Sequence, residues 1–93
     1  MQPQDTLLDA RKHAVASRRE EQIQRAAALL RESFDAGAFR TYVSFPPDWH
    51  ADAATDATDE ALVRIGLREF GKVRYVEELV RSVRVTVFWR FHR

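Results

Sequence analysis

Three neighbouring polar side chains are the first candidates for chemistry in this chain. Asp48, His50 and Asp52 stand at alternate positions around Trp49, and carboxylate and imidazole groups are ligands of divalent metal ions. A histidine beside carboxylates can also act as a general base. Alternate positions on one short segment seldom converge on a single ion, and the other histidines are distant in sequence. We therefore expect no metal and no cofactor, and an enzyme that uses His50 is the weakest of three functional hypotheses.

The residue types present and their spacing exclude several other common catalytic and phosphate-binding motifs. The chain has no cysteine, which excludes a disulfide scaffold, a thiolate metal site and a cysteine nucleophile. It has three glycines, and none stands beside a serine, so neither a serine nucleophile elbow nor a glycine-rich phosphate loop is present. A length of 93 residues, with 45% hydrophobic and 31% charged residues, predicts one globular domain over 1–93.

The start of the chain gives no sign of targeting. Residues 1–6 lack the basic start and the long apolar run of a signal peptide, and no stretch approaches the roughly 18 apolar residues of a membrane span. We expect a cytoplasmic protein without membrane contact, with residues 1–4 disordered.

The C-terminal segment 83–93 carries the clearest pattern in the chain. Its side chains alternate in character, and successive side chains of a strand point to opposite faces. One predicted face is apolar and consists of Val83, Val85, Val87, Trp89 and Phe91. The other face combines cations and aromatic rings, and from it we select Arg84, Phe88, Arg90 and His92 as the candidate partner-binding residues.

Charge is distributed unevenly along the chain. Residues 37–63 contain one basic and five acidic side chains, whereas residues 64–93 contain eight basic and three acidic ones. Such polarity favours oriented association with a charged partner. The alternative is that the acidic segment folds over the cationic face of the C-terminal strand and neutralises it.

Apolar periodicity predicts the other elements. Ile23, Ala27, Leu30 and Phe34 recur at helical spacing before Gly37. We expect a helix over about 18–36 and a weaker one over about 5–15, or one continuous helix in their place. A strand is expected over 39–45, with Phe39, Thr41, Val43 and Phe45 on one face. An acidic loop over 46–57 and a helix over about 59–70, with Thr58 as its start signal, follow. Residues 72–82 favour a short helix because Val73, Val76 and Val80 have helical spacing, and a hairpin strand is the alternative.

These elements predict an α+β fold. One or two N-terminal helices pack on a small antiparallel sheet of two or three strands, in which 39–45 pairs with 83–92 and 72–79 is the candidate third strand. With a strand at the C-terminus, edge pairing into a homodimer is a further expectation.

The leading functional hypothesis is a non-enzymatic protein-binding module. It describes an inhibitor, adaptor or assembly component of the kind that phages and mobile elements encode. The alternative is nucleic-acid binding through the basic C-terminal third, either on the cationic strand face or through a helix-turn-helix over 59–82.

Overall fold

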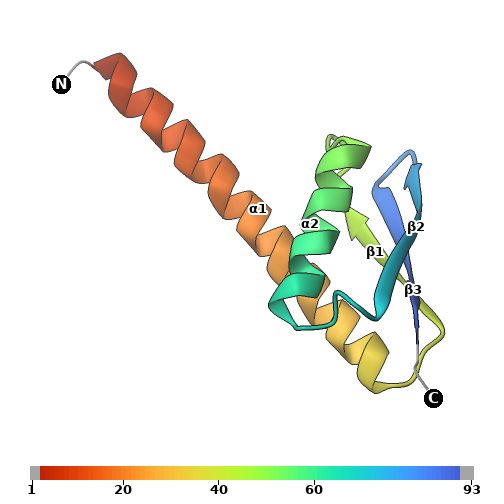
Figure 1. The fold of residues 1–93 in the computed structure, drawn as a ribbon. Helices are drawn as coiled ribbons and strands as arrows, with labels where there is room; N and C mark the ends of the chain where they lie inside the picture. Colours follow the sequence, from red (N-terminus) through yellow and green to blue (C-terminus); the bar gives the residue numbers. More distant parts are fainter. Residues whose placement is uncertain (1–2, 91–93) are drawn as a thin grey trace.

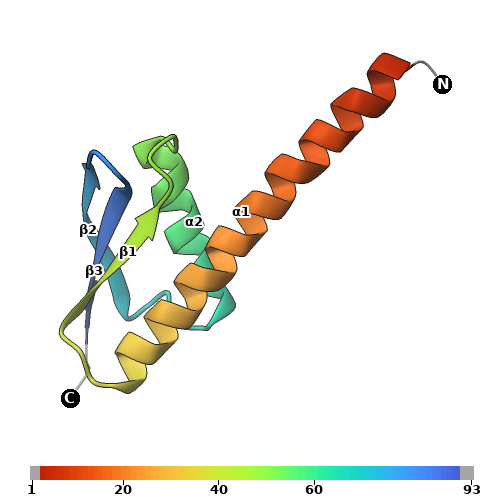
Figure 2. The same ribbon diagram turned by 180° about the vertical axis from the view of Figure 1, so that it is seen from behind.

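The chain folds into an α+β domain with two layers. The computed structural model describes the backbone of residues 3–90 and the side chains of residues 17–90. The elements are α1 (Pro3–Asp35), β1 (Arg40–Phe45), α2 (Ala51–Arg64), β2 (Gly71–Glu78) and β3 (Val83–Trp89). Both helices lie on the same side of the three-stranded sheet (Figure 1, and from behind in Figure 2). The predicted fold class is confirmed.

The C-terminal strand is the centre of the sheet. The strand order is β1-β3-β2, and both pairings of β3 are antiparallel. The predicted pairing of β1 with β3 is confirmed, with Val43 opposite Val85. Because β3 is paired on both sides, it has no free edge for a second copy, so the predicted homodimer could pair only through β1 or β2.

The N-terminal third forms one continuous helix rather than two. Ile23, Ala26 and Leu30 of α1 are fully or almost fully buried against the sheet, at the helical spacing expected for a core-facing stripe. The first turns of α1 extend beyond the sheet and α2 (Figure 1). The predicted disorder of residues 1–4 lies partly outside the described residues, and α1 already includes Pro3 and Gln4.

The second helix begins earlier than the sequence predicted. It spans Ala51–Arg64 instead of about 59–70, so the predicted acidic loop ends at His50. Thr58 is no helix start: it lies in mid-helix, fully buried, and its Oγ1 donates a hydrogen bond to the carbonyl of Ala54 at 2.8 Å. Alanine has the highest helix propensity, and the alanines of this segment outweigh the capping preference of one threonine.

The favoured short helix over 72–82 is wrong, because this segment contains β2. The register between β2 and β3 shifts between Val73 and Tyr75, so Arg74 is the extra residue of a β-bulge. The bulge lets Val73 and Val76, three residues apart, both pack on the core. The helical spacing of these valines in the sequence therefore results from a β-bulge in a strand. Because this segment is a strand, the helix-turn-helix considered for residues 59–82 does not form.

Both helices end at a glycine in the left-handed region. Gly37 and Gly66 each have φ of 72°. The amide of Gly66 donates to the carbonyl of Val63, and the amide of Leu67 donates to that of Leu62, which is the Schellman arrangement. These turns redirect the chain from the helix layer into the sheet. Among the described residues, neither helix is long and apolar enough to cross a membrane.

Candidate functional site

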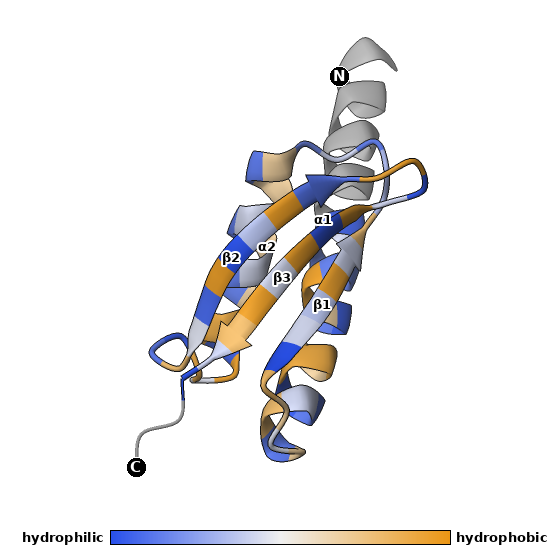
Figure 3. Cartoon of the chain, turned by 90° about the vertical axis from the view of Figure 1, so that its right-hand side faces the viewer, coloured by the Kyte–Doolittle hydropathy of each residue, from blue (hydrophilic) through white to orange (hydrophobic). Residues whose placement is uncertain are grey.

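One face of the sheet is left uncovered by the helices, and Figure 3 looks directly onto it. We call it the open face. It consists of three cross-strand rows in the order β1, β3, β2, which are Arg40–Phe88–Lys72, Tyr42–Thr86–Tyr75 and Ser44–Arg84–Glu77. Aromatic and cationic side chains predominate among these nine residues.

Phe88 is the centre of an aromatic cluster on the open face. The ring of Phe39 meets it edge to face, with the centroids 5.5 Å apart and the planes at 90°. Tyr75 makes a second edge-to-face contact at 6.2 Å. Phe39 and Tyr75 are nevertheless 71% and 57% exposed. Edge-to-face contacts hold aromatic rings in a preferred geometry, so the cluster is an ordered apolar patch in water.

A second cluster is built around Tyr42. The guanidinium groups of Arg84 and Arg40 lie 4.9 and 5.5 Å from the centre of its ring, within range of a cation–π attraction. Arg84 also pairs with Glu77 across the strands at 2.9 Å. The Nε of Arg84 is buried without a hydrogen-bond partner among the described residues. These contacts orient Arg84 over the sheet and leave it partly exposed.

The acidic segment does not neutralise the open face. Residues 51–64 form α2, which packs on the opposite side of the sheet (Figure 1). Glu60 pairs with Arg19 and Arg64, and Asp59 lies 3.5 Å from Arg68. The prediction that this segment folds over the cationic strand face is therefore wrong. Among the described residues, Glu77 is the only acidic ion-pair partner of an open-face cation.

The predicted site residues have three different outcomes. Arg84 and Phe88 lie on the open face, half-buried, as the alternation indicated. Arg90 follows β3 and is exposed, and its amide donates to the carbonyl of Phe70. His92 lies outside the described residues. Phe91, predicted for the apolar face, also lies outside them.

The sequence prediction missed the aromatic neighbours of these residues. Phe39 was predicted to share the core face of Val43 and Phe45, but it precedes β1 and its ring contacts Phe88 instead. Tyr42 follows from alternation within β1. Tyr75 could not be assigned a face because the bulge at Arg74 changes the alternation there. The signal available in the sequence was that Arg40 and Ser44, the residues two positions before and after Tyr42 on the same strand face, are polar.

The first chemical candidates do not form a metal centre. Among the described residues, no group of three histidine or acidic side chains could bind a metal ion. Asp48 and His50 line a surface cavity, whereas Asp52 lies in the first turn of α2. The chain matches no family model, no curated protein and no solved structure. Its function must therefore be inferred from its own surfaces.

Proposed function

We propose that this protein is a non-enzymatic protein-binding module and that its open face is the binding surface. The observation that carries the proposal is the ordered aromatic cluster of Phe39, Tyr75 and Phe88 in water, bordered by Arg40 and Arg84. Aromatic residues and arginine are the residue types that contribute most to protein interfaces. Edge-to-face packing fixes the rings before a partner arrives, which reduces the entropy lost on binding.

The charge of the open face indicates the chemistry of the partner. Arg40 and Lys72 flank the Phe88 ring, and neither has an ion-pair partner among the described residues. Two copies stacked by this face would bring like charges together around the aromatic cluster, which disfavours a homodimer of that kind. We propose a partner whose surface combines an apolar patch with carboxylates.

The test is affinity capture from the native host by three tagged proteins. The wild type, Phe88→Ala and Arg40→Glu are compared by quantitative mass spectrometry. We expect one acidic partner with the wild type and at least a tenfold lower yield with each variant, because an aromatic anchor and a charge reversal each remove about 1.5 kcal/mol or more. Val63→Ala is the matched control, since Val63 is 60% exposed but lies on α2.

Circular dichroism must show that all variants are folded. If folded Phe88→Ala and Arg40→Glu capture the same proteins in the same yield as Val63→Ala, the open face is not the binding surface and the proposal fails.

Nucleic-acid binding is the second candidate, and one observation favours it. Aromatic rings and cations on an uncovered antiparallel sheet are also a means of binding single strands, through base stacking and phosphate contacts. The contacts within the protein count against nucleic-acid binding, because the ring of Tyr42 is already engaged by Arg40 and Arg84, and the rings of Tyr75 and Phe88 contact each other. Fluorescence anisotropy with labelled oligo-dT and oligo-U at 20 and 200 mM salt tests it. Phosphate-driven binding must weaken steeply as salt rises, and no binding at 20 mM eliminates this candidate.

A further inference from the structure

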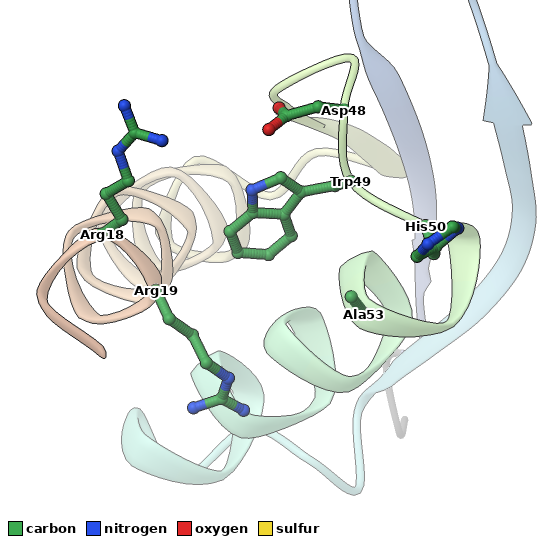
Figure 4. A pocket seen from close by; sticks show the side chains of 6 residues that line it. All are labelled: Arg18, Arg19, Asp48, Trp49, His50 and Ala53. Carbon is green, nitrogen blue, oxygen red and sulfur yellow. The ribbon is translucent and has the colours of Figure 1, made fainter. Parts of the chain in front are cut away.

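A cavity of about 310 Å³ lies between α1, α2 and the segment that joins β1 to α2. It is separate from the open face. Arg18 and Arg19 of α1, Asp48, Trp49 and His50 of the connection, and Ala53 of α2 line it (Figure 4). Cavities that bind small molecules begin at about 300 Å³, so this one is large enough for a ligand of one or two rings.

The indole of Trp49 forms the apolar wall of the cavity. One side of the indole stacks on Phe45, with ring centroids 5.1 Å apart and an interplanar angle of 21°. Phe45 is buried in the core, so the stack fixes the orientation of the indole. Figure 4 shows the indole between the arginines of α1 and Ala53 of α2. A rigid ring beside a small residue offers a planar group a surface on which to stack.

The charged groups of the cavity are of both signs. Arg19 is engaged by Glu60 at 2.8 Å. Arg18 and Asp48 are both exposed and have no ion pair among the side chains that the structure describes, residues 17–90. The cavity therefore offers an unengaged guanidinium from α1 and an unengaged carboxylate from the segment that joins β1 to α2, beside an aromatic surface.

We infer that this cavity binds a small ligand in which a planar aromatic ring carries both an acidic group and an N–H donor. The ring stacks on Trp49, the acidic group pairs with Arg18, and the N–H donor bonds to the carboxylate of Asp48. Aromatic amino acids and purine nucleotides share this chemistry. The ligand site is independent of the proposed function, because none of its residues belongs to the open face.

The experiment is a titration followed by NMR of the two indole N–H signals. The probes are L-phenylalanine and adenosine monophosphate, with glycine, inorganic phosphate and adenosine as partial ligands. Trp89 is the internal control, since its indole N–H donates to Ser33 Oγ at 3.0 Å in the core. We expect either or both of the two full probes to shift the Trp49 signal saturably and the Trp89 signal not at all, and the partial ligands to bind at least tenfold more weakly. The probe that binds more tightly identifies the source of the ligand.

Two substitutions make the assignment specific. Arg18→Gln and Asp48→Asn should each weaken the better probe about tenfold, because each removes a charge-assisted hydrogen bond. Arg25→Gln, also exposed on α1 but outside the cavity, should have no effect. The inference is overturned if neither full probe shifts Trp49 at 10 mM, if both tryptophans shift together, or if Arg18→Gln binds as the wild type does.

Discussion

The two faces of β3 differ in what covers them. On one face Val83, Val85 and Val87 are at most 1% exposed, under the two helices. On the other face Arg84 and Phe88 are half-buried, and Thr86 is 3% exposed without any helix above it. Thr86 is flanked by Tyr42 and Tyr75 in the same cross-strand row, and we attribute its burial to these two side chains. The first face is closed by the fold, whereas the second is organised by its own side chains and remains available to a partner.

This difference predicts that the open face can be changed without loss of the fold. Residues under the helices bury apolar area that drives folding, while residues on the open face interact mainly with one another. Substitutions on the two faces should therefore differ in their effects on the free energy of unfolding.

The largest effect is expected in the helix layer. Leu30→Ala should lower the free energy of unfolding by about 3 kcal/mol, because Leu30 is fully buried against the sheet. Its neighbour Leu29 is 45% exposed on the same helix, so Leu29→Ala should cost less than about 1 kcal/mol. Urea denaturation measures both. If both substitutions lowered the free energy of unfolding equally, the face of α1 that carries Leu30 would not be the one that packs on the sheet.

A smaller effect compares adjacent residues of β3. Val87→Ala should cost about 2 kcal/mol, since Val87 is fully buried. Phe88→Ala removes a larger side chain but should cost only about 1 kcal/mol, because its ring is half-buried and its contacts are with the exposed rings of Phe39 and Tyr75. Chemical denaturation gives both values. A larger loss for Phe88→Ala would show that the open face is part of the stabilising core.

The smallest effect concerns the acidic groups of the helix layer. Arg64 holds the pKa of Glu20 below its ordinary value of 4.5, and Arg19 and Arg64 do the same for Glu60. A lowered folded-state pKa gives stability that is present above pH 4.5 and is lost as the pH falls through the folded-state value. The urea midpoint of the wild type should therefore fall more steeply below pH 4.5 than that of Glu60→Gln. Parallel pH profiles would show that these exposed ion pairs contribute nothing measurable.

The alternation along β3 was sufficient to predict the core face of the sheet and its pairing with β1. It could not predict β2, because a bulge at Arg74 gives the core valines of that strand a helical spacing. The capping preference of threonine misplaced the start of α2. Thr58 lies buried within that helix and donates its hydroxyl to a carbonyl of the same helix, so it resembles a cap only in the sequence. Tertiary contacts decide which secondary structure a segment with such a local pattern adopts.

The site was predictable in part for the same reason. Arg84 and Phe88 follow from strand alternation, but the exposure of their face depends on both helices packing on the other side. A sequence pattern gives the two faces of a strand and not the position of the helices. The neighbours contributed by Phe39 and Tyr75 come from other segments, and only the folded chain brings them to Phe88.

Site-specific photo-crosslinking in the native host tests the open face most directly. A photoreactive phenylalanine derivative replaces Tyr75, which is 57% exposed on the open face, or Val63, which is 60% exposed on α2. The proposed function predicts a discrete crosslinked protein from position 75 and none from position 63. A crosslink from position 63 alone, or none from either position when both proteins are folded and expressed, would contradict it.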